Sequence, residues 1–271
     1  MKKSQVLKTA MMVSAVSVAC LSLTNLGASA DTDNLPSIGK SQADVSFTSN
    51  GGSTTPVDPD NPDNPGGGGT GNKGPLSLDA VPTYLNFGTH TQPNIDTAYT
   101  LLSKSASQDS LATANDDKTQ NVTTSSTKGS NDVIYTQVSD SRGTGAGWQL
   151  KAQLSDITAS DGQVLTDASV VLTGGSPQYL TGEAKQQSWI TAADANQATV
   201  STPIVLNAGA SSTTDVATAA AGSKVGEGQG MGVNQQYWNT NNVQLHVKGG
   251  HAAAKNYSGN IVWTLNSTPT A

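Results

Sequence analysis

The stretch Trp148-Gln149-Leu150-Lys151-Ala152-Gln153-Leu154 alternates strictly between apolar and polar side chains. In a β-strand, residues i and i+2 point to the same side. Trp148 and Leu150 therefore share one face with Ala152 and Leu154, and the polar residues share the other. Such a pattern is typical of a strand with one buried and one solvated face, so the stretch predicts a sheet packed against an apolar core.

A second triplet, Trp263-Thr264-Leu265, repeats the local Trp-x-Leu pattern. Two of the four tryptophans in the chain thus carry a leucine two residues later. Further strand signals, each bounded by Gly, Asn, Asp, Ser or Pro, recur at Leu76 to Val81, Tyr84 to Gly88, Ile95 to Leu102, Asp132 to Val138, Val164 to Leu172, Val200 to Leu206, Val243 to Val247 and Ile261 to Leu265.

Helical periodicity is scarce. The Ala-rich stretches Thr191 to Ala198 and Asp215 to Ala221 have room for a helical turn or two, but they lack an apolar stripe. Many short strands without alternating helices predict an all-β fold, a single β-sandwich or irregular barrel over residues 75–271. The polar stretches 103–130 and 207–236 are too long for hairpin turns, so we expect excursions or binding loops there.

The N-terminus carries an export signal. Lys2, Lys3 and Lys8 precede an apolar stretch, and Ala28-Ser29-Ala30 is a small-x-small cleavage site, so residues 1–30 are predicted to be a signal peptide. Residues 31–74 are predicted to be a disordered linker rich in Pro, Asp and Gly, because a repeated Pro-Asp-Asn unit runs into four glycines. No apolar run is long enough to predict a membrane span.

The charge of the mature chain narrows the function classes. Residues 1–30 hold three lysines and no acidic residue, so eleven basic residues remain against 20 acidic ones, a net charge of −9. An acidic surface repels phosphate backbones, which excludes nucleic acid as an expected partner. The one cysteine, Cys20, lies within the signal, so we expect neither a disulfide nor a thiolate site after cleavage.

Catalytic signals are weak, and we expect no enzyme. The three histidines, His90, His246 and His251, have no acidic or third histidine partner at metal-ligand spacing, so no metal site is predicted. No serine sits in a Gly-x-Ser-x-Gly elbow. Asp116 and Asp117 lie in a polar stretch with nothing to raise either pKa. We expect no cofactor.

The flanks of the triplets resemble the WxL-domain family of secreted Gram-positive cell-surface proteins. Gly74 to Leu78 resembles the opening of such a domain, and Pro82 with Phe87-Gly88 follows it. Tyr135 to Gly143 with Gly147-Trp148-Gln149-Leu150 resembles the first family signature, and Tyr257 to Leu265 resembles the second. The resemblance covers Gly74 to Ala271.

The resemblance implies a non-catalytic module that attaches its carrier non-covalently to the cell wall through peptidoglycan. It also implies association with other surface proteins of the same export cluster, and a cell-surface location after secretion. The residues carried over as the wall-binding motif are Trp148, Gln149, Leu150, Trp263, Thr264 and Leu265. An adhesin or surface-complex subunit that binds a protein partner is the alternative function.

Two interpretations of the tryptophans stay open. Either both triplets form a shared core, as buried tryptophans do in small sandwiches, or they form a partly exposed aromatic platform. A core would move the wall contact to candidate surface groups, which are Gln149, Asp140, Arg142, Lys151 and loops holding Tyr237 and Trp238. Asp140 and Arg142 are also the partners of an expected ion pair that fixes the turn before Trp148.

Overall fold

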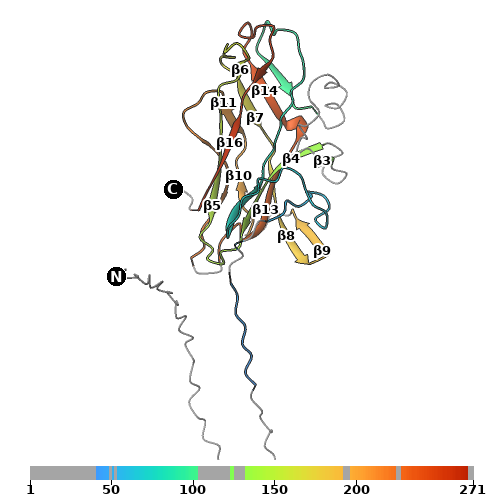
Figure 1. Cartoon of the computed structure of the whole chain (residues 1–271), viewed down its shortest axis with the longest axis vertical. Coiled ribbons are helices and arrows are strands. Elements are labelled where there is room, and N and C mark those ends of the chain that lie inside the picture. Colours follow the sequence, from blue (N-terminus) through green and yellow to red (C-terminus); the bar gives the residue numbers. More distant parts are fainter. Residues whose placement is uncertain are drawn as a thin grey trace, which may run out of the picture. The chain divides into compact units, whose positions relative to one another are not determined.

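In the part of the chain that the structure describes, the regular secondary structure is almost all β, arranged in several open sheets with no closed barrel (Figure 1). The computed structural model describes residues 41–48, 51, 54–102, 132–191, 196–223 and 227–267, and the backbone alone of 123–124. The predicted all-β class is confirmed, and the fold is an open, layered arrangement of sheets. The expected signal peptide, residues 1–30, lies outside the described residues.

The largest sheet has six strands, all paired antiparallel. Its path runs from β1 through β4, β13 and β8 to β9, and β3 pairs with the first residues of β4. The bounds are β1 Leu76–Ala80, β3 Thr123–Thr124, β4 Asp132–Asp140, β8 Ser176–Glu183, β9 Gln186–Ile190 and β13 Gly232–Asn239.

The described residues also form two four-stranded sheets and a two-stranded one, again with antiparallel pairing. The first is ordered β10 (Thr199–Val200), β12 (Thr214–Ala219), β5 (Trp148–Leu154) and β16 (Ile261–Asn266). The second is ordered β11 (Ile204–Asn207), β7 (Ser169–Leu172), β14 (Val243–Val247) and β2 (Thr97–Thr100). β6 (Thr158–Ala159) pairs with β15 (Tyr257–Ser258), and the 3-10 turn η1 (Thr240–Asn242) joins β13 to β14.

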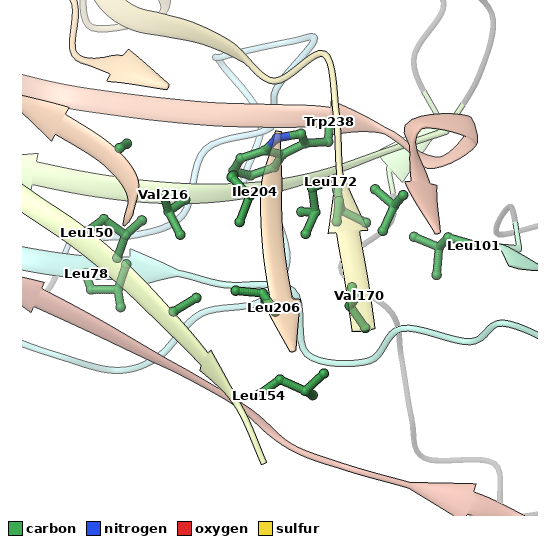
Figure 2. Close-up of a cluster of buried hydrophobic side chains, with 14 of the residues drawn as sticks. Leu78, Leu101, Leu150, Leu154, Val170, Leu172, Ile204, Leu206, Val216 and Trp238 are labelled. Carbon is green, nitrogen blue, oxygen red and sulfur yellow. The ribbon is translucent and has the colours of Figure 1, made fainter. Parts of the chain in front are cut away.

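The three larger sheets share one hydrophobic core (Figure 2). Trp238 of the six-stranded sheet reaches toward Ile204 and Leu172 of the second four-stranded sheet. Leu150 of β5 belongs to the same cluster. Burying such side chains stabilises the fold by about 1.5–3 kcal/mol each.

The six-stranded sheet is also covered on its other face, by a segment that we call the strap, residues 54–67. The backbone of Val57 and Pro59 bonds to glutamines of the sheet, and Pro59 is buried. Trp189 Nε1 donates to the carbonyl of Asp58 at 2.9 Å, and the Tyr135 hydroxyl donates to the carbonyl of Gly67 at 2.7 Å. A proline-rich extended backbone leaves its carbonyls free for such donors.

The strap is held mainly by three glutamines that stand opposite one another on β4, β13 and β8: Gln137, Gln235 and Gln178. Gln178 Nε2 donates to Gln235 Oε1 at 2.8 Å, and Gln235 Nε2 donates to Gln137 Oε1 at 3.0 Å. The same amides bind Val57, whose N–H donates to Gln137 and whose carbonyl accepts from Gln235. The amides and the strap backbone thus satisfy each other in the interior, and every residue of β4 is buried.

The strap differs from the sequence-based expectation. Residues 54–67 fall within 31–74, where composition predicts a disordered linker, yet they pack on the sheet. Composition does not predict this packing, because the apolar contacts of the strap come from prolines. Its polar contacts use backbone N–H and C=O groups, which are present in any sequence. Part of the predicted linker, residues 31–40 among them, lies outside the described residues.

Three other expectations are corrected. The signal at Tyr84 to Gly88 forms no strand. The Ala-rich stretch from Asp215 is strand β12 rather than a helical turn, because Ala217 and Ala219 face Leu150 and Trp148 and make room for those large side chains. The stretch 207–236, expected to be a loop, holds β12 and the start of β13. Most of 103–130 lies outside the described residues.

Asp79 on β1 lies beside Gln137, at the end of the row of three glutamines, and its burial makes the stability of the protein depend on pH. Its Oδ2 accepts from Gln137 Nε2 at 3.1 Å and from the Ser139 hydroxyl at 2.5 Å. Burial raises the pKa of Asp79, and these hydrogen bonds lower it by less. The folded protein therefore holds a proton on Asp79 more readily than the unfolded chain, so this group disfavours folding at neutral pH and ceases to do so as the pH falls through its raised pKa.

We expect Asp79→Asn to melt roughly 2–4 °C above the wild type at pH 7, the shift that about 1 kcal/mol gives a domain of this size. The amide oxygen keeps an acceptor for Ser139 and Gln137. The difference should shrink as the pH is lowered toward about 4. Melting curves over this range test the prediction, and a gap that widens on acidification would contradict it.

Candidate functional site

The two Trp-x-Leu triplets lie on neighbouring strands, β5 and β16. In the antiparallel register, Trp263 stands opposite Ala152 and Leu265 stands opposite Leu150. Residues directly opposite each other project to the same face. The tryptophans and leucines of both triplets therefore share the inner face of the sheet, and Gln149 and Thr264 project to the outer face.

Trp148 is part of the core. Its side chain is 0% exposed, and its Nε1 donates to the carbonyl of Gly230 at 3.0 Å. Gly230 has φ +71°, and a Cβ there would lie 2.5 Å from the same Nε1, so the glycine lets the chain pass tightly against the indole. Of the two interpretations, a shared core holds for Trp148, and a platform that displays this indole is excluded.

Trp263 is only partly buried, packed against the rim of the core. It lines a groove of about 340 Å³ that lies between the edge strands β1 and β16. Leu76, Leu78 and Leu265 line the groove together with Trp263, and Asn72 and Lys73 also border it. We call this the edge groove.

The turn that leads into β5 is fixed by an ion pair between Asp140 and Arg142. Arg142 donates twice to the carboxylate, through Nε at 2.9 Å and Nη2 at 2.7 Å, and also binds the carbonyls of Gly147 and Ser267. These bonds tie the turn to the end of β16, and the hydrogen bond to Asp140, together with its negative charge, raises the pKa of Arg142. The expected ion pair is confirmed.

Several candidate surface contacts are corrected. The Asp140 side chain is 1% exposed and committed to Arg142, so it is not a surface group. Gln149 is buried although it projects outward. Tyr237 and Trp238 lie on the central strand β13 rather than on loops, and Trp238 is fully buried because its ring fills the space between the sheets.

Lys151 remains at the surface, within a polar sheet face. Opposite residues in the register place it beside Asp215 of β12 and Thr264 of β16. Lys151 Nζ lies 3.2 Å from Asp215 Oδ1, so the two charges offset each other. We define the outer face of this sheet as Lys151, Gln153, Asp215, Thr218, Val262 and Thr264.

The outer face offers hydroxyl, amide and methyl groups along neighbouring strands, and its two charges, Lys151 and Asp215, are paired with each other. Thr264 is exposed, and Val262 is 58% exposed. Such a surface can bind a neutral, hydroxyl-rich polymer through hydrogen bonds and apolar contact, without net charge attraction. The sequence indicates this outer face through the polar residues that alternate with the tryptophans and leucines in β5 and β16. The triplets are the more conspicuous pattern, so these polar residues received less weight.

One known protein family matches most of this chain. The family model of the WxL domain, described as a surface domain that binds the cell wall, matches residues 35–269. The chain belongs to the WxL-domain family. No curated protein and no solved structure matches it.

As a WxL-domain protein, the chain is a cell-surface protein that binds the cell wall. The family match begins at residue 35 and so takes in the strap as well as the segment before it. The tryptophans and leucines of the WxL signature have a structural role, because together they build the inner face of one sheet. Within the described residues, no helix has the length and apolar character that a membrane crossing requires.

Proposed function

We propose that this WxL domain attaches the protein non-covalently to peptidoglycan through the outer face of the β10-β12-β5-β16 sheet. Residues 1–30 direct export, and the mature protein stays at the outside of a Gram-positive cell. The observation that carries the proposal is the alternation of the two strands. The tryptophan and leucine of each triplet face the inside of the sheet, while Thr264 of the second triplet is exposed and Lys151, next to the first triplet on the outer face, is partly exposed.

The charge of the molecule supports binding by shape and hydrogen bonds. A mature net charge of −9 disfavours an anionic wall polymer held by charge. Lys151 is compensated by Asp215, so the outer face adds no strong field of its own. Glycan strands and their peptides carry hydroxyl and amide groups that suit such a face.

We also propose that the domain binds the wall without cleaving it. Glycoside hydrolysis commonly uses two carboxyl groups placed on either side of the scissile bond. The outer face has one carboxylate, Asp215, and Lys151 engages it. These groups can hold a sugar, but they supply no acid and base pair for its cleavage.

A sedimentation assay tests the function. The purified mature chain is mixed with peptidoglycan stripped of protein and of wall polymers, and in parallel with intact cells. We expect the protein to pellet with the stripped peptidoglycan and to release no soluble sugar. Pelleting with intact cells alone would instead favour the alternative, an adhesin or surface-complex subunit that binds a protein partner. Sugar release would overturn the non-catalytic proposal.

A further inference from the structure

β16 ends its sheet with an unpaired edge. The strand order is β10-β12-β5-β16, and within the described part of the chain no strand pairs with the far side of β16. Its six residues include Val262, which is 58% exposed, and Trp263, which is partly buried. A long apolar edge with free N–H and C=O groups is a ready template for another strand, and proteins usually cover such edges.

The edge groove adjoins this free edge. Trp263 and Leu265 of β16 and Leu76 of β1 give it apolar walls. Its volume of about 340 Å³ is enough to receive apolar side chains from a chain laid along the strand. Lys73 is exposed and borders the groove, so the site combines an apolar slot, an open backbone edge and a positive charge.

A segment with the complementary pattern precedes the strap. Ala43-Asp44-Val45-Ser46-Phe47-Thr48 alternates apolar and polar residues over six positions, the same length as β16. Val45 is 79% exposed and Phe47 is 89% exposed. Two such side chains in water are unfavourable unless they are buried against something else. The family match includes this segment, so it belongs to the WxL module.

We propose that residues 43–48 of one copy add as a strand to the free edge of β16 in a second copy, with Val45 and Phe47 in the edge groove. The added strand supplies the missing backbone partners, as in other cases of strand addition. Asp44 gives the added strand a negative charge, and Lys73 lies at the border of the groove along which that strand is laid. If each copy donates its segment to the other, the exchange closes as a two-fold dimer.

This inference goes beyond wall attachment, because the apolar side chains that line the edge groove, Trp263 and Leu265, project to the inner side of β16. A dimer would present two outer faces to the wall. Two linked sites raise the overall avidity without any new contact to the ligand.

The oligomeric state of the full mature chain tests the proposal. We expect light scattering after size exclusion to report a concentration-dependent dimer. Val45→Asp combined with Phe47→Asp should weaken the dimer at least tenfold. The melting temperature of this double variant should equal that of the wild type at concentrations low enough for both to be monomers, because both side chains are already exposed in the single chain. The matched control is Ile95→Asp, which charges another side chain that is 75% exposed, and it should dimerise as the wild type does.

Charge reversal gives an independent check. Lys73→Glu and Asp44→Lys should each weaken the dimer severalfold, and the two changes together should restore it. A wild-type chain that stays monomeric at about 100 µM would overturn the proposal, whether or not the segment docks within its own chain. So would a dimer that tolerates the Val45 and Phe47 changes. Because wall pelleting is measured separately, failure here leaves the proposed wall attachment standing.

Discussion

Replacing Trp148 by alanine is expected to lower the free energy of unfolding by about 3–5 kcal/mol. The indole is 0% exposed, so its removal leaves a large cavity between the sheets. It also strips the carbonyl of Gly230 of the bond from Nε1. For Trp263→Ala we expect a smaller loss of about 1–3 kcal/mol, because part of that ring is already in water.

Chemical denaturation of both variants, read beside wall pelleting, checks this prediction. Trp148→Phe is the control, since it keeps most of the apolar volume and should unfold between the wild type and the alanine variant. We expect wall binding by Trp148→Ala to fall only as far as the folded fraction falls. If Trp148→Ala lost binding while melting like the wild type, the indole would be a ligand contact and its buried placement would be wrong.

Arg142→Met should cost roughly 2–4 kcal/mol of folding free energy. The change leaves the Asp140 carboxylate, 1% exposed, without its cation, and frees the carbonyls of Gly147 and Ser267. We place the loss toward the lower part of the range for buried ion pairs, because the Arg142 side chain is 16% exposed and already partly hydrated.

A double variant separates charge from geometry at this turn. Adding Asp140→Asn to Arg142→Met removes the buried charge and keeps an oxygen that can accept from the backbone N–H of residue 142. The double variant should regain about half of the lost stability, as a double-mutant cycle by denaturation would show. An Arg142→Met protein as stable as the wild type would mean that Asp140 is hydrated rather than enclosed.

The sequence predicted best where one physical rule governed a strand. β5 and β14 occur at the predicted residues, and β16 extends one residue further, to Asn266. Their apolar and polar positions alternate because one face meets the core. The Asp140–Arg142 pair was also predictable, because the two residues stand two apart at a glycine-rich turn.

The sequence failed where burial is polar. β13 is Gly-Val-Asn-Gln-Gln-Tyr-Trp-Asn, which reads as a loop, yet Gln235 and Gln236 are fully buried. Gln235 is satisfied by the neighbouring glutamines and by the strap, and Gln236 accepts from Thr136. These partners lie 57 or more residues away in the chain, so no local pattern announces them.

The site was predicted only in part for the same reason. The sequence pointed to Trp148, Leu150, Trp263 and Leu265. It did not decide whether they form a buried core or an exposed platform, because alternation alone does not show which face of a strand is buried. The register resolves this by placing Ala217 and Ala219 against the first triplet. Tyr237 and Trp238 were assigned to a loop because β13 itself was missed.

The most direct test of the account is peptidoglycan pelleting by a variant of the outer face. Lys151→Ala, Val262→Ser and Thr264→Ala together remove one partly exposed and two exposed side chains of that face and leave the inner face intact. The matched control, Gln244→Ala with His246→Ala, changes the outer side of β14 in the other four-stranded sheet. The account predicts at least tenfold weaker pelleting for the first variant, wild-type pelleting for the control, and unchanged melting for both. Equal pelleting by the two variants would contradict it.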